Sequence, residues 1–274
     1  MKTLLILGAG TAGTIMASTL RNKLPKGVWT ITLVDRAPDH YYQPGYLFMP
    51  FGIYTENDVR RPMTRTVPRG VDYREADVDR IDAAANRVLL PDGTEVPYDL
   101  LVTVPPNMGA EMIDRSGLGD ELNYVPTDKH TLQCKAHANI FVIGDATDCP
   151  TSKAGSVAHF ESEVLTENIL HFIAGQPLRS RFDGHANCFI ESGHGKAFLL
   201  DFNYDQEPVT GTFPFPALGP MRLLAESRLN HLGKMAFRWV YWNILLPGWP
   251  IPLVGHKMSL RGKKIPPKEM KAAA

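Results

Sequence analysis

The chain has 274 residues, 44% of them hydrophobic, and its 29 acidic and 29 basic side chains balance. This length can bury the core of one large or two small domains, and the balanced charge gives no sign of a nucleic-acid partner. Its three cysteines are too few for a disulfide framework, no His/Cys cluster predicts a metal, and the first apolar run is too short for a signal peptide, so a cytoplasmic location is expected.

The first thirteen residues predict a strand followed by a nucleotide-binding turn. Residues 4–7 form an apolar run that is typical of a strand buried on both faces of a parallel sheet. Gly8, Gly10 and Gly13 then give the spacing GxGxxG, and residues 14–23 are predicted to be a helix. Gly8 permits a tight turn, Gly10 lets the backbone approach a pyrophosphate, and Gly13 lets the helix pack closely on the strand.

A second apolar strand, residues 29–34, ends in Asp35, at the distance expected for an acid that binds a ribose hydroxyl. Together these features form a βαβ unit and predict a bound dinucleotide; the alternative is a glycine-rich turn that binds none. The segment 37–52 is rich in proline, glycine and aromatic residues, so we expect it to pack over a ligand or against another domain. The residues predicted to contact the cofactor here are Gly8, Gly10, Thr11, Ala12, Gly13, Asp35, Arg36, Tyr42, Gln43, Pro44 and Gly45.

The next stretch is predicted to be a small antiparallel insertion. Residues 71–78, 80–86 and 87–90 have the composition of short strands, and 91–93 is a Pro-Asp-Gly turn. Residues 95–104 are predicted to be a further strand that returns to the main sheet.

An apolar strand is predicted at residues 139–146, ending in Gly144 and Asp145, and a helix is predicted from about 154 to 173. This order is typical of the second half of an FAD site. Asp145 would accept a hydrogen bond from the ribityl chain, and the helix start, with Lys153 and Ala154, would direct its amides and positive dipole end at the flavin. The alternative is an ordinary loop between strand and helix.

The C-terminal part is predicted to hold a hairpin and an amphipathic helix. Residues 186–191 and 197–202 are predicted strands, and 221–246 are helical in period, with basic residues interleaved with apolar ones. The apolar run is too short to span a bilayer, so we expect an interfacial anchor outside the nucleotide domain; a dimer interface is the alternative. The tail from Lys257 is basic and expected to be partly disordered, and its lysines to bind anionic headgroups.

Several strings of the sequence resemble the sulfide:quinone oxidoreductases, which are flavoproteins built from two dinucleotide-binding domains. The strings that carry the resemblance are Tyr42-Gln-Pro-Gly-Tyr46, Pro105-Pro-Asn-Met108, Val125-Pro-Thr-Asp-Lys-His-Thr-Leu132, Gly144-Asp-Ala146, Pro150-Thr-Ser-Lys-Ala-Gly-Ser-Val-Ala-His159, Asn187-Cys-Phe-Ile-Glu191 and Leu200-Asp-Phe-Asn-Tyr204. The resemblance implies bound FAD, sulfide or another sulfur donor, a membrane quinone as acceptor, and monotopic attachment to the inner face of the plasma membrane.

The sequence departs from this family in one large way. Residues 98–102, which usually lead into an inserted NAD-type domain, run straight into residues 103–106, which usually follow it. An insert between neighbouring strand ends can be lost without breaking the parent sheet. The expected fold is therefore α/β, with a Rossmann-like FAD-binding domain on a parallel central sheet (1–175) and a smaller C-terminal α+β segment ending in amphipathic helices (176–274).

The resemblance also implies the redox residues. Cys188 matches one cysteine of the family's sulfur-binding pair, while its usual partner lies in the missing domain. Cys149 is the best substitute, although it is equally explained as a small apolar residue, and Cys134 is expected to be incidental. Lys153 is a candidate to stabilise charge on the reduced flavin or a solvated helix-start residue, and His159 is a candidate proton relay or a core histidine. Rival functions are an electron-transfer subunit and a non-catalytic FAD-binding protein.

Overall fold

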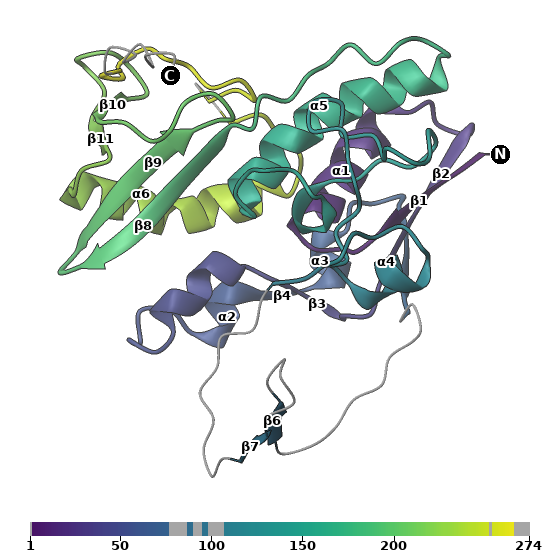
Figure 1. Ribbon diagram of the computed structural model, residues 1–274, viewed down its shortest axis with the longest axis horizontal. Coiled ribbons are helices and arrows are strands. Elements are labelled where there is room, and N and C mark those ends of the chain that lie inside the picture. The colour runs from purple at the N-terminus through teal and green to yellow at the C-terminus, as the bar shows by residue number, and fades with distance from the viewer. Residues whose placement is uncertain (1, 77–86, 90–94, 98–106, 252–253, 266–274) are drawn as a thin grey trace.

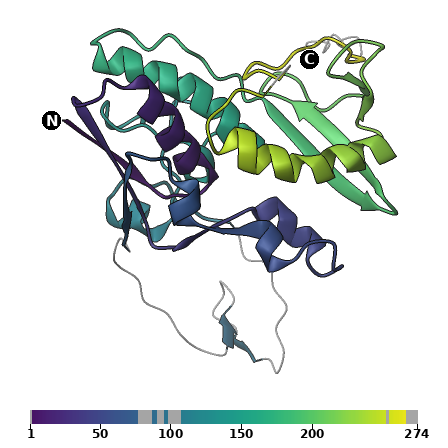
Figure 2. The same cartoon turned by 180° about the vertical axis from the view of Figure 1, so that it is seen from behind.

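The computed structural model describes residues 2–76, 87–89, 95–97, 107–251 and 254–265 (Figure 1). An N-terminal parallel sheet with two long helices forms one half of the molecule, and a mixed, mainly antiparallel sheet with a third helix forms the other half (Figures 1 and 2). The two halves meet where the third helix ends.

The first sheet has the parallel order β1-β2-β5, in which β1 is Lys2–Leu7, β2 is Trp29–Asp35 and β5 is Asp72–Glu75. Leu4 pairs with Ile31 and Ile6 with Leu33. Helix α1 (Thr11–Lys23) packs against helix α5 (Gly155–Ile173). The predicted βαβ unit is therefore present, with a helix that begins three residues earlier than expected.

Two sequence predictions about this sheet are wrong. Residues 72–75 belong to the main parallel sheet and not to an antiparallel insertion, because they pair with β2. Residues 139–143 are not a strand. Phe141 forms one isolated bridge to Gln133, the N–H of Val142 donates to the carbonyl of Leu132 at 2.9 Å, and the chain then enters the 3-10 turn η2 (Gly144–Ala146). The backbone of this apolar run is thus partnered by a nearby loop, which prevents it from forming a ladder.

Several short elements precede α5 in the chain. Strand β3 (Asp39–Tyr41) pairs with β4 (Arg60–Pro62), and the chain between them forms the 3-10 turn η1 (Gln43–Phe48) and helix α2 (Glu56–Val59). Helices α3 (Met63–Thr66) and α4 (Glu111–Arg115) are also short. Strands β6 (Arg87–Leu89) and β7 (Glu95–Pro97) form a separate antiparallel pair. The predicted strand 80–86, the turn 91–93 and the return of residues 98–104 to the main sheet lie outside the described residues.

The second sheet has the order β10-β11-β9-β8, and the predicted hairpin forms its larger part. Its strands are β8 (Ala186–Gly193), β9 (Lys196–Phe202), β10 (Gly211–Phe213) and β11 (Met221–Leu223). Helix α6 (Arg228–Val240) lies across β9 and β8 and continues into the π-helical turn η3 (Tyr241–Leu245) (Figure 1). Residues 221–246 were expected to be helical throughout. The first three instead form strand β11, because they pair with β10 and β9, and a turn separates this strand from α6.

The C-terminal segment shares a core with the nucleotide half. Tyr241, Trp242 and Leu245 are buried in one cluster with Ile15 of α1 and Tyr42. We expected residues 221–246 to form a membrane anchor outside the nucleotide-binding domain. This expectation is wrong for η3, because the N-terminal half covers its apolar side chains. Within the part of the chain that the structure describes, none of the helices has the length and apolar character needed to cross a bilayer.

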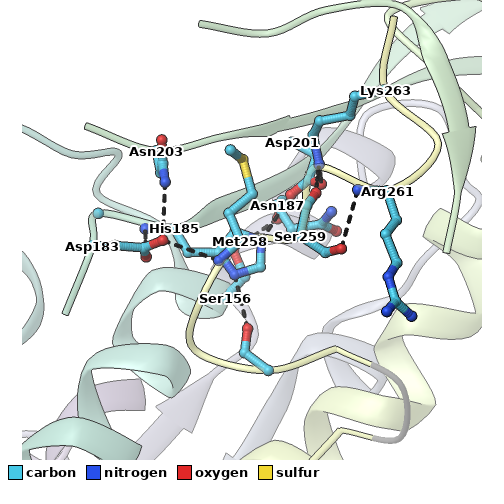
Figure 3. Close-up of polar contacts among 12 residues, drawn as sticks. Ser156, Asp183, His185, Asn187, Asp201, Asn203, Met258, Ser259, Arg261 and Lys263 are labelled. Atoms are coloured by element: carbon cyan, nitrogen blue, oxygen red, sulfur yellow. Dashed lines mark hydrogen bonds and ion pairs between the residues drawn. The ribbon is translucent and has the colours of Figure 1, made fainter. Parts of the chain in front are cut away.

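The described part of the basic tail is ordered by specific bonds. The ammonium group of Lys263 forms a buried ion pair with Asp201 of β9, and the N–H of Met258 donates to Asp183 at 3.1 Å (Figure 3). Residues 257–265 of the tail are therefore ordered, and Lys263 is not available to a lipid headgroup because its charge is already paired.

Candidate functional site

A cavity of about 1230 Å³ lies between the start of α1, the start of η1 and the turn that leads into α5. Most of the residues predicted to contact a cofactor line it: Gly8, Gly10, Thr11, Ala12, Gly13, Asp35, Gln43, Pro44, Gly144, Asp145, Lys153 and Ala154. The remaining three are not among the residues that line it. Arg36 is exposed, Tyr42 is fully buried in the core, and a Cβ on Gly45 would lie 2.5 Å from the side chain of Val59. The fold therefore brings both predicted half-sites to one cavity.

The three glycines of the turn have different surroundings. Gly8 has φ of +90°, which favours glycine, and its N–H donates to the carbonyl of Val34 at 2.8 Å. A Cβ on Gly13 would lie 1.8 Å from the carbonyl oxygen of Gly8, so close packing of helix on strand requires glycine there. A Cβ on Gly10 would meet nothing within 4 Å and would enter open space beside the helix start. This open space is where a pyrophosphate group would approach the backbone.

Asp35 also fixes the turn. Its carboxylate accepts the N–H of Ala9 at 2.5 Å and the N–H of Ala37 at 2.9 Å. Asp35, the acid predicted to bind a ribose hydroxyl, lines the cavity. Its hydrogen bonds also tie the glycine-rich turn to the end of β2.

Two helix N-termini are directed at the cavity. Helix α1 begins after Gly10 and α5 begins after Ala154, and neither first turn has a side-chain cap. Uncapped N–H groups at a helix start carry partial positive charge and bind anions. A dinucleotide fits this donor set, because its pyrophosphate would lie at one helix start and its ring system at the other.

The Gly144 turn is held by a buried carboxyl group that the sequence analysis missed. The N–H of Gly144 donates to Oε2 of Glu161 at 2.7 Å, and Glu161 is fully buried. Burial raises the pKa of Glu161 to about 8, so this side chain holds a proton at neutral pH. The sequence signal was an acid two residues beyond His159, within the buried part of an otherwise largely apolar helix.

Lys153 and His159 have different surroundings. Lys153 lines the cavity, and its ammonium group donates to the carbonyl of Thr147 and lies 4.8 Å from the ring centre of Tyr124. His159 is 1% exposed, and its Nε2 lies 3.5 Å from the carboxylate of Glu163. Burial lowers the pKa of His159, which favours the neutral ring. The lysine therefore faces the cavity, and the histidine belongs to the interior.

The three cysteines are separate thiols. Cys188 is half-buried on β8, with its Sγ 4.0 Å from Oγ of Ser152, and burial raises its pKa. Cys149 is buried in the core between α1 and α5, where burial raises its pKa to about 11. Cys134 lies in another apolar cluster. Cys188 therefore contacts Ser152, in the segment just before α5. The start of α5 is one of the two helix starts that line the cavity.

Two further residues at the site were missed. His40 and Tyr241 are almost fully buried, line the cavity, and are joined by a 2.7 Å contact between Nε2 and the phenol oxygen. Their sequence separation is 201 residues, and neither belongs to a local motif.

The parallel sheet, the glycine-rich turn and the paired helix starts define an α/β fold of the kind that is typical of dinucleotide-binding proteins. No protein-family model matches the chain. Its sequence is 29% identical over 204 residues to the mitochondrial sulfide:quinone oxidoreductase of Mus musculus, covering 73% of this chain and 44% of that protein. It is 34% identical over 156 residues to the same enzyme of Schizosaccharomyces pombe, covering 56% and 34%.

The chain is thus related to the sulfide:quinone oxidoreductases, which confirms the resemblance that its motifs predicted. The X-ray structure of sulfide:quinone oxidoreductase from Aquifex aeolicus has the same fold, with a TM-score of 0.65 at 14% identity over 89% of this chain and 92% of that one. The chain spans less than half the length of the curated relatives it matches.

Proposed function

We propose that this chain is an FAD-dependent oxidoreductase of the sulfide:quinone type. Electrons would pass from sulfide or a related sulfur donor, through Cys188 and the flavin, to a membrane quinone. The observation that carries the proposal is the convergence of the GxGxxG turn and the Gly144–Asp145 turn on one cavity, in a chain related to enzymes of that name.

The chain's own residues have separate tasks at this site. The start of α1, with Gly10 and Thr11, would hold the pyrophosphate, and Asp145 would hold the ribityl chain. FAD supplies a ring that takes up an electron pair and passes it on. The start of α5 and the ammonium group of Lys153 would stabilise negative charge on that ring, because both place positive charge at the cavity wall.

Cys188 is the proposed sulfur-binding residue. Its Sγ lies 4.0 Å from Oγ of Ser152. Ser152 immediately precedes Lys153, which lines the cavity. Burial raises its pKa, so the thiol is neutral until a base or a partner sulfur activates it. A disulfide with Cys149 would require Cα atoms less than about 7 Å apart. Cys149 is 5% exposed within the apolar core, so this partnership requires the 149–152 turn to move.

Helix α6 supports attachment to a lipid surface. Its exposed residues include Leu229, Leu232 and Trp239, which are 40%, 59% and 62% exposed. With Ala236 they lie at spacings of three and four residues, so they form one apolar face turned to solvent. Arg228, the first residue of α6, is exposed and would contact anionic headgroups. We therefore propose peripheral, monotopic binding at the inner face of the plasma membrane.

The test is anaerobic addition of sulfide to FAD-loaded protein, followed by flavin absorbance. The flavin absorbance of wild type should fall on adding sulfide. The flavin of Cys188→Ser should keep its absorbance, and that of Cys149→Ser should lose it much more slowly than wild type. Cys134→Ser is the matched control, because Cys134 lies in a separate cluster, and it should behave like wild type. Equal rates for wild type and Cys188→Ser would remove this cysteine from the mechanism.

A second candidate is an FAD-binding electron-transfer subunit or a non-catalytic flavoprotein. It is favoured by the burial of Cys149, which is 5% exposed. Bound FAD that sulfide fails to reduce in every variant would support this candidate, and reduction of that flavin by a protein partner would separate its two forms.

A further inference from the structure

A chain of hydrogen bonds links the C-terminal helix to the nucleotide-binding turn. Tyr241 follows directly after α6 and is 1% exposed. Its phenol oxygen lies 2.6 Å from Oγ1 of Thr11, the first residue of α1, and 2.7 Å from Nε2 of His40. The other ring nitrogen of His40, Nδ1, lies 3.0 Å from the carbonyl oxygen of Ala9. Two bridges therefore run from one tyrosine to both sides of Gly10.

The directions of these bonds follow from their partners. A carbonyl oxygen only accepts, so Nδ1 of His40 carries a proton and donates to Ala9. Burial lowers the pKa of His40 to about 4, so its Nε2 carries no proton at neutral pH and accepts. Tyr241 must then donate to His40, and the hydroxyl of Thr11 must donate to Tyr241.

Other bonds hold the same turn. The carbonyl of Ala9 also accepts the hydroxyl of Thr14 at 2.9 Å, and the N–H of Ala9 donates to Asp35. The peptide groups of Ala9 are thus fixed from the sheet, from α1 and from Tyr241. A turn fixed before the ligand arrives loses less conformational entropy on binding.

We propose that Tyr241 and His40 are positioning residues for FAD, so that the C-terminal helix completes the dinucleotide site. The inference rests on the proposed binding of FAD and assigns part of its affinity to a segment more than 200 residues from the glycine-rich turn. Removing the phenol hydroxyl leaves Nε2 of His40 buried without a donor and frees the side chain of Thr11.

The experiment is titration of apoprotein with FAD, read as the quenching of flavin fluorescence. Tyr241→Phe should bind FAD about tenfold more weakly, because it removes the hydrogen bonds to both His40 and Thr11. Tyr54→Phe is the matched control. Tyr54 is buried in the same aromatic cluster, but its hydroxyl meets only the sulfur of Met235 at 4.0 Å, so the affinity should stay at the wild-type value.

Thr11 provides the second arm. Thr11→Val should lose affinity by a smaller factor, because it removes one of the two bonds of Tyr241, and Thr11→Ser should retain it. The double variant that combines Thr11→Val with Tyr241→Phe should bind no more weakly than Tyr241→Phe alone, because Tyr241→Phe already removes the bond that Thr11→Val removes. Wild-type affinity in Tyr241→Phe, or losses that add in the double variant, would overturn the inference. Failure of the wild-type protein to bind FAD would instead overturn the proposed function.

Discussion

Nε2 of His185 lies 2.7 Å from Oδ1 of Asp201, and both side chains are almost fully buried (Figure 3). Nδ1 of the same ring lies 2.8 Å from the carbonyl oxygen of Gly255. Both partners are acceptors, so the ring of His185 bridges the tail and the carboxylate of Asp201. Lys263 contacts the other oxygen of the carboxylate, so Asp201 lies between two buried partners that fasten the tail to β9.

Asp201→Asn should strongly destabilise the protein. Burial opposes the charge of Asp201, but the hydrogen bonds and charges of His185 and Lys263 outweigh it and hold the pKa of Asp201 below its usual value. Removing the carboxylate leaves the buried ammonium group of Lys263 without its counter-charge, which typically costs about 3–5 kcal/mol. Urea unfolding measures this loss. Glu226→Gln, in the exposed pair with Lys196, is the control and should change the midpoint little. Equal midpoints for the two variants would contradict the assignment.

Gly10→Val and Gly13→Ala should fail in different ways. A side chain at Gly10 enters open space, so Gly10→Val should fold normally and purify without flavin colour, because it blocks the approach of a pyrophosphate. A methyl group at Gly13 would collide with the Gly8 carbonyl, so Gly13→Ala should lower the thermal midpoint of the apoprotein. Visible absorbance and thermal unfolding separate the two results, and full flavin occupancy in Gly10→Val would show that the site is misplaced.

Glu161 should make stability depend on pH. Its pKa rises from 4.5 to about 8 on folding, mainly because of burial, with the nearby Asp145 adding to the rise and the Gly144 N–H and Lys153 opposing it. A raised folded pKa gives stability that is complete below pH 4.5 and is lost as the pH rises toward 8. Relative to Glu161→Gln, wild type should lose up to about 1.4 kcal/mol per pH unit within that window. Parallel stability curves for the two proteins would show that Glu161 does not titrate there.

Charges on the exposed face of α6 should release the protein from lipid. Leu232→Glu with Trp239→Glu places two carboxylates on the proposed membrane-binding face, and the double variant should no longer float with anionic liposomes. Val28→Glu is the control, since Val28 is 46% exposed and immediately precedes β2, a strand that lies in the other half of the molecule (Figure 1). If wild type fails to float and the α6 variant converts a dimer to a monomer in sedimentation, this face is a subunit interface.

The parts of the fold that depend on residues close together in the chain could be predicted before the structure was known. The GxGxxG turn, the strand that ends in Asp35, helix α5 and the β8–β9 hairpin were all predicted, because each follows from the spacing of residues within about twenty positions. Most predicted cofactor contacts line the cavity for the same reason, since glycines and helix starts have local signatures.

Contacts between segments that are far apart in the chain could not be predicted, because they depend on how the segments pack in the folded protein. The apolar run at residues 139–143 has the composition of a strand, but its hydrogen bonds go to Leu132 and Cys134, a choice that depends on which backbone lies beside it. Lys263 belongs to a tail that is polar in sequence, yet it is buried on Asp201, and Tyr241 reaches Thr11 across 230 residues. Contacts between distant segments leave no spacing pattern in the chain, because only the folded packing brings such side chains within hydrogen-bond distance.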